Sequence, residues 1–111
     1  MNGPEILAFT LEVAPPCMAE TLERNGLAVD EIDWFVFHQA SFMLLERLRE
    51  ELKLPKERFV IDIENYGNTV SSTIPLALYD LAADGRLKQG DTVLTMGFGV
   101  GLSWGGTVFR W

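Results

Sequence analysis

Three short segments of this 111-residue chain could take part in chemistry. The single histidine, His38, stands in the run Phe-His-Gln-Ala-Ser, Asn68 stands in Tyr-Gly-Asn-Thr-Val, and a glycine-rich stretch spans 97–105. Each segment comes where an apolar run ends and a loop or helix begins. In layered α/β folds ligand sites gather at that edge, because the loops there converge over the strand ends. A histidine in this position is well placed to donate a hydrogen bond into a pocket.

Each segment, taken alone, also has an ordinary structural explanation. A lone histidine at a strand end is often a satisfied structural residue, and Gly-Asn before a helix is common turn chemistry. The glycine-rich stretch lacks the GxGxxG-to-helix context of a dinucleotide site. Cys17 follows two prolines with no histidine nearby in the sequence, so we interpret it as a packing residue. Evidence for a function must therefore come from the order and spacing of the three segments.

The strands that position these segments are predicted from short apolar runs. Residues 32–37, 58–63 and 91–96 are rich in β-branched and aromatic side chains, which favours buried strands. Residues 102–110 are expected to return as an antiparallel hairpin partner of the last strand. A fold in which helices alternate with such strands is predicted to be a layered α/β fold.

Helices are predicted between these strands. Pro15-Pro16 is expected to kink or split the first helix, so that a second piece, about 16–25, ends at a left-handed Gly26. Ser41 is expected to cap the next helix. A third helix, 70–83, has almost no polar face. A helix of that kind belongs between two layers, which predicts that more protein covers it than this chain supplies.

Composition excludes several classes of function. The formal net charge of −7 argues against nucleic acid, because phosphate binding needs clustered Lys and Arg. No apolar run approaches the roughly 20 residues of a membrane span, and the N-terminus has no signal-peptide layout. One cysteine and one histidine offer no metal site. The cytoplasm is therefore the expected compartment, with no membrane partner.

Together the segments resemble the C-terminal half of β-ketoacyl-acyl-carrier-protein synthase III, in the thiolase-like superfamily. The resemblance runs over 1–111 without an evident gap. It is carried by I-D-W-F-V-F-H-Q-A, Y-G-N-T-V-S-S-T-I-P-L-A-L, D-G-R-L-K-Q-G-D and G-F-G-V-G-L-S-W-G. Plant-type polyketide synthases also pair His with Asn, but around HPGG-like and GNMSSA-like sequences that are absent here. The resemblance implies a thiolase-like layered fold, of which this is the C-terminal half, with a mixed sheet and helices on both faces.

The resemblance also implies a mechanism. In the family a cysteine of the N-terminal half takes an acyl group from acyl-CoA, and the acyl-enzyme condenses with malonyl-acyl-carrier protein. By motif match His38 and Asn68 donate to the enolate oxygen formed on decarboxylation, at about 3–4 kcal/mol per donor in well-studied oxyanion sites. The backbone N–H of Val100, where relatives often have glycine, is implied as an oxyanion donor, and Phe98 is expected near the nucleophile.

Two departures concern the pantetheine arm of the substrates. The family commonly has an asparagine where this chain has Ser41, and another where it has Pro4. Recognition of CoA or of the carrier protein is therefore expected to differ, and an unusual acyl donor in secondary metabolism is an alternative.

The nucleophilic cysteine is the main part that this sequence lacks. The family requires a cysteine on a buried helix of a preceding half, and Cys17 has neither that context nor the required order relative to His38. We expect a fragment of a longer chain, inactive alone, whose partners are its missing N-terminal half and an acyl-carrier protein, with no cofactor. A non-catalytic α/β assembly module is the competing hypothesis. The apolar third helix further predicts a homodimer with Ile74, Leu78 and Leu81 at or near the contact.

Overall fold

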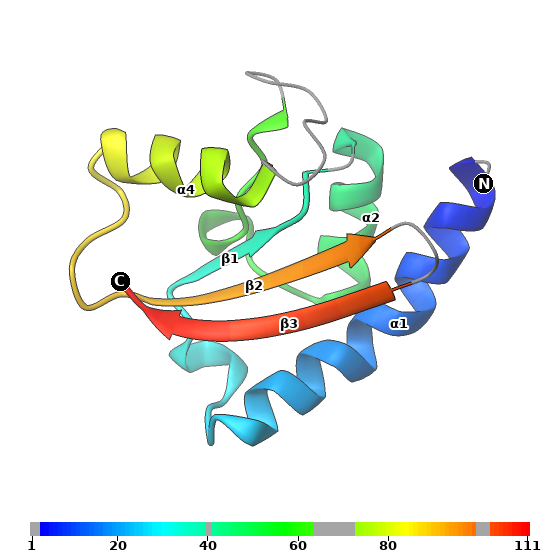
Figure 1. Cartoon of the computed structure of the whole chain (residues 1–111), viewed down its shortest axis with the longest axis horizontal. Helices are drawn as coiled ribbons and strands as arrows, with labels where there is room; N and C mark the ends of the chain where they lie inside the picture. The colour runs from blue at the N-terminus through cyan, green and yellow to red at the C-terminus, as the bar shows by residue number, and fades with distance from the viewer. Residues whose placement is uncertain (1–2, 40, 64–72, 100–102) are drawn as a thin grey trace.

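The structure is a computed structural model that describes residues 3–39, 41–63, 73–99 and 103–111 (Figure 1). The helices are α1 (Gly3–Arg24), α2 (Phe42–Leu52) and α4 (Thr73–Ala83), with single 3-10 turns at Val29–Glu31 and Lys56–Arg58. The strands are β1 (Trp34–Phe37), β2 (Thr92–Gly99) and β3 (Ser103–Arg110). They form one mixed sheet in the order β1-β2-β3, in which β1 and β2 run parallel and β2 and β3 antiparallel. The predicted α/β fold and the antiparallel return strand are confirmed.

Apolar side chains cover both faces of the sheet, because successive residues of a strand point to opposite sides. The face under α1 and α2 carries Phe35, Phe37, Leu94 and Met96. The face under α4 carries Val36 and Val93, which pack with Ala77 and Leu81 of that helix. Figure 1 shows α1 and α4 on opposite sides of the strands. The prediction of a mixed sheet with helices on both faces is thus confirmed.

Of the kink or split expected at Pro15-Pro16, the split is wrong. α1 runs without interruption across both prolines. A proline inside a helix costs about 3 kcal/mol or more, because a backbone hydrogen bond is lost. Around the prolines Ala14, Cys17 and Met18 are buried against the sheet, and this packing offsets the cost. The end of the helix was predicted correctly, since Gly26 has a φ of +63°.

The predicted strand at 58–63 is also wrong. Only Phe59 bridges to β1, opposite Phe35, and the Val60 amide donates to the Phe35 carbonyl at 3.0 Å. Beyond that point the backbone of the segment bonds to the side chain of Gln39 instead of to a strand. A buried amide side chain therefore takes the place of the next ladder residue.

The helix α4 is apolar on more than its sheet-facing side. Thr73, Ala77 and Leu81 are buried, whereas Ile74 and Leu78 are half-buried. Leu81 therefore belongs to the core of the chain itself, and of the three residues expected at a dimer contact only Ile74 and Leu78 offer surface. Within the described ranges, no helix has both the length and the apolar character needed to cross a membrane.

Candidate functional site

His38 lies directly after β1, at the carboxyl edge of the sheet. Its backbone N–H donates to the Met96 carbonyl of β2 at 2.9 Å, which extends the parallel ladder by one residue. The side chain is half-buried, and its Nδ1 atom lies 2.6 Å from Thr73 Oγ1. Burial lowers the pKa of His38, since desolvation disfavours the imidazolium. The ring is therefore neutral near pH 7.

Thr73 joins the end of β1 to the start of α4. It is the first residue of that helix in the described part of the chain, and its side chain is only 3% exposed. The Gln39 backbone N–H donates to the same oxygen that contacts His38, at 3.2 Å. The Thr73 hydroxyl thus contacts two consecutive residues, His38 and Gln39, after the end of β1.

The Gln39 side chain fixes the strand end from the opposite direction. Its Nε2 group donates to the carbonyls of Phe37 at 2.8 Å and Val60 at 3.2 Å, and its Oε1 atom accepts from the Asp62 amide at 2.6 Å. Gln39 is 2% exposed, and a buried amide with all of these partners is costly to replace. These hydrogen bonds therefore fix the backbone next to His38.

Phe98 lies at the same edge of the sheet as His38. The parallel register pairs Phe37 with Met96, so Phe98 follows two residues beyond that pair on β2. It is half-buried and packs against the core under α1 and α2. Two of the three sequence segments, those of His38 and Phe98, thus converge at one sheet edge. Thr73, which follows the Asn68 segment in the sequence, contacts His38.

Ser41 is the N-cap of α2, as predicted. Its φ and ψ of −160° and 158° are extended, and its Oγ atom accepts the Leu44 amide at 3.1 Å. The residue is exposed. The hydroxyl proton remains as the group that a ligand could use.

Two of the candidate residues, Asn68 and Val100, lie outside the described residues. The expected approach of His38 and Asn68 therefore stays a prediction. Thr73 and Gln39 were not assigned roles from the sequence, although both stand in the motifs that carry the resemblance. A hydrogen bond across 35 positions, such as that between His38 and Thr73, leaves no periodic signal in a sequence.

Cys17 lies on the side of α1 that packs against β3. It is 7% exposed, and burial, together with the nearby Glu20 charge, raises the pKa of its thiol against the opposing effect of a Thr21 hydrogen bond. A thiol with a raised pKa is a poor nucleophile. The interpretation of Cys17 as a packing residue agrees with this environment.

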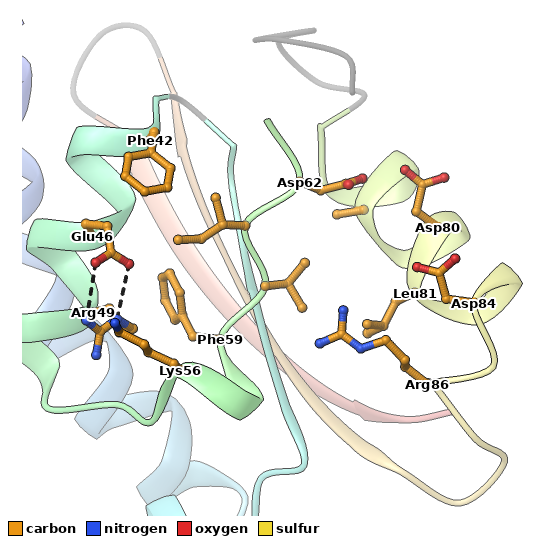
Figure 2. Close-up of a pocket in the computed structure, with 13 residues that line it drawn as sticks. Phe42, Glu46, Arg49, Lys56, Phe59, Asp62, Asp80, Leu81, Asp84 and Arg86 are labelled. Atoms are coloured by element: carbon orange, nitrogen blue, oxygen red, sulfur yellow. Dashed lines mark hydrogen bonds and ion pairs between the residues drawn. The ribbon is translucent and has the colours of Figure 1, made fainter. Parts of the chain in front are cut away.

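A groove of about 320 Å³ lies between α2 and α4 (Figure 2). Its walls carry both signs of charge, with Glu46 and Arg49 on the α2 side and Asp80 and Asp84 on the α4 side. The Arg49 guanidinium bonds Glu46 at 3.3 Å and the Leu54 carbonyl at 3.2 Å, so it is engaged within the chain. His38 does not line this groove. The candidate site is therefore the sheet edge.

Comparison with known proteins identifies the family of the chain. The family model described as 3-oxoacyl-(acyl-carrier-protein) synthase III C terminal matches residues 22–111. A β-ketoacyl-(acyl-carrier-protein) synthase III of Microcystis aeruginosa is 41% identical over the whole chain, which covers 33% of that relative.

Solved structures give the same result. A 3-oxoacyl-(acyl-carrier-protein) synthase III superposes with a TM-score of 0.97 at 42% identity, over 100% of this chain and 33% of that one. A priming β-ketosynthase from a polyketide biosynthetic pathway superposes with a TM-score of 0.92 at 33% identity, over 99% of this chain and 33% of its own. The chain thus spans about a third of the length of these relatives, and it belongs to the 3-oxoacyl-(acyl-carrier-protein) synthase III family, whose C-terminal part it matches.

Proposed function

We propose that this chain supplies the His–Asn pair for a decarboxylative Claisen condensation in fatty acid biosynthesis. The observation that carries the proposal is the placement of His38. It sits neutral and half-buried at the carboxyl edge of β1, and its ring bonds the helix that follows the Asn68 segment. Family membership makes this edge the place where the reaction is expected.

The chemistry needs neutral hydrogen-bond donors. When a malonyl thioester loses CO₂, negative charge builds on the thioester carbonyl oxygen. Preorganised donors aimed at that oxygen lower the barrier by about 3–4 kcal/mol each. His38 and Asn68 are the proposed donors, and neither places a negative charge beside the enolate. The acyl-bearing cysteine would come from the rest of a full-length enzyme.

The remaining site residues have supporting roles in this proposal. Phe98 flanks the nucleophile, and the Val100 backbone N–H donates to the oxyanion formed during cysteine acylation. The Ser41 hydroxyl contacts the pantetheine arm of acyl-CoA or malonyl-carrier protein. No cofactor is required. The isolated chain is expected to be inactive, because it has no cysteine in a suitable position.

A chimera tests the proposal directly. The matching third of the Microcystis aeruginosa synthase III is replaced by this chain, and 3-oxoacyl product is measured from an acyl-CoA and malonyl-carrier protein. We expect product from the chimera and none from the 111-residue chain alone. A folded chimera that binds both substrates but forms no product would favour the assembly-module hypothesis.

A second candidate is a related acyltransferase of secondary metabolism. The similarity to a polyketide priming ketosynthase favours it, as do Ser41 and Pro4 at positions where the family commonly has asparagine. The same chimera, assayed with a panel of acyl-CoA donors, separates the two. A preference for acetyl-CoA supports fatty acid biosynthesis, and a preference for a bulkier donor supports the alternative.

A further inference from the structure

The Thr73 hydroxyl lies between two nitrogen atoms of the segment that follows β1. Its oxygen is 2.6 Å from His38 Nδ1 and 3.2 Å from the Gln39 backbone nitrogen. Thr73 is 3% exposed, so bulk water competes little for these contacts. We propose that Thr73 is a positioning residue: its hydroxyl donates to His38 Nδ1 and thereby keeps the proton of the imidazole on Nε2.

The direction of this hydrogen bond follows from the protons available. A threonine hydroxyl has one proton to donate and two lone pairs that accept. The Gln39 amide can only donate, so it occupies one lone pair of Thr73 Oγ1. If an Nδ1–H group of His38 donated to the second lone pair, the hydroxyl proton of Thr73 would need a further acceptor. Among the described residues, Oγ1 has no other hydrogen-bonding contact than these two.

A buried donor without an acceptor is costly, and the arrangement in which the Thr73 hydroxyl donates to His38 Nδ1 satisfies all three groups with the described residues alone. In that arrangement Gln39 N–H donates to Thr73, and Thr73 O–H donates to the lone pair of His38 Nδ1. An oxygen that accepts one hydrogen bond also becomes a better donor, so the two bonds strengthen each other. The short distance of 2.6 Å agrees with a strong contact.

This hydrogen bond determines which ring nitrogen of His38 can donate. A neutral imidazole carries one proton, and with Nδ1 accepting, that proton is on Nε2. The meaning of this tautomer for catalysis rests on the proposed function. An Nε2–H can donate to an enolate oxygen, whereas the other tautomer would present a lone pair to the same negative atom.

The test uses the fact that His38 is the single histidine of the chain. In a two-bond ¹H–¹⁵N correlation spectrum at neutral pH, the ring nitrogens are told apart because Nε2 couples to both ring C–H protons and Nδ1 to one. We expect the Nε2 shift of a protonated nitrogen and the Nδ1 shift of an unprotonated, hydrogen-bonded one. The reverse pattern in the wild-type chain would overturn the inference.

Three variants separate positioning from structure. Thr73→Val keeps the shape and removes the hydroxyl, and it should shift the tautomer ratio toward Nδ1–H by roughly fivefold or more, as expected for one hydrogen bond. Thr73→Ser should restore the wild-type pattern. Thr21→Val is the matched control, because Thr21 is also buried and donates to the Cys17 carbonyl in α1. It should leave the pattern unchanged.

An unchanged tautomer in Thr73→Val would refute the role of the hydroxyl. If that variant does not fold, Thr73→Ala provides the same comparison. These readouts do not depend on condensation. The two proposals can fail separately. If the tautomer depends on Thr73 but the chimera stays active without His38, the positioning role of Thr73 is supported and the proposed function is refuted.

Discussion

Substitution of Gly106 by alanine is expected to destabilise the chain through one defined contact. Gly106 lies in β3 where α1 crosses the sheet. A Cβ atom at this position would lie 2.5 Å from Thr21 Oγ1 and 3.4 Å from Cys17 Sγ. The first distance is far inside van der Waals contact, and the nearby atoms belong to a packed helix. Either the Thr21 side chain must leave its rotamer and its hydrogen bond to the Cys17 carbonyl, or α1 and β3 must move apart.

The size of the effect follows from two opposing contributions. Overpacking of this kind costs about 1–3 kcal/mol. Replacing glycine by alanine in extended backbone recovers about 0.4–1 kcal/mol, because the unfolded chain loses freedom. Gly106→Ala should therefore lower the free energy of unfolding by roughly 1.3 kcal/mol, which is the difference between the midpoints of the two ranges.

Gly105 provides the control within the same strand. A Cβ atom there meets nothing within 4 Å, so Gly105→Ala should be neutral or slightly stabilising. Urea unfolding, followed by circular dichroism, measures both variants under identical conditions. The Thr21→Ala background removes the clashing oxygen, so Gly106→Ala should cost less there, with a coupling of about 1 kcal/mol or more. Equal stability of the Gly105 and Gly106 variants, or strict additivity with Thr21→Ala, would refute the close packing of α1 on β3.

Three further predictions concern the site and the apolar helix. Burial holds the pKa of His38 below its unfolded value of about 6.5, so the unfolded chain binds the proton more tightly. The free energy of unfolding should therefore fall as the pH drops through that value, and a urea midpoint that does not change with pH would contradict this. Ser41→Ala should cost about 1 kcal/mol, measured by the same unfolding assay, whereas Ser41→Asn should retain the cap. Sedimentation of the isolated chain at micromolar concentration should show a homodimer or larger species that Ile74→Lys with Leu78→Lys dissociates, and a monomeric wild type would refute it.

Local signals predicted the elements whose structure depends on local chemistry. Ser41 caps α2, and the left-handed Gly26 ends α1 as expected. The two errors have a common cause. Pro15-Pro16 and the apolar run 58–63 have clear local preferences, but packing against the sheet overrides the first and the Gln39 side chain overrides the second. Neither interaction is visible in the segment itself.

Part of the site could be predicted from the sequence, because it depends on where the strands end. His38 directly follows β1 and Phe98 lies near the end of the parallel strand β2, so the topology alone brings them to one edge. The contact between His38 and Thr73 depends on where α4 begins relative to that edge, which no spacing rule fixes. Residues that support a functional side chain are therefore harder to identify from sequence than the side chain itself.

The most direct test of the central claim compares two half-reactions in the chimeric enzyme. Decarboxylation of malonyl-carrier protein and acylation of the cysteine are measured separately for His38→Ala and Asn68→Ala. Loss of one preorganised donor should slow decarboxylation by about 100-fold or more, while Asn68→Ala should affect acylation much less. Unchanged decarboxylation in both variants, or an equal loss of both half-reactions in Asn68→Ala, would contradict the assignment of this pair as enolate donors.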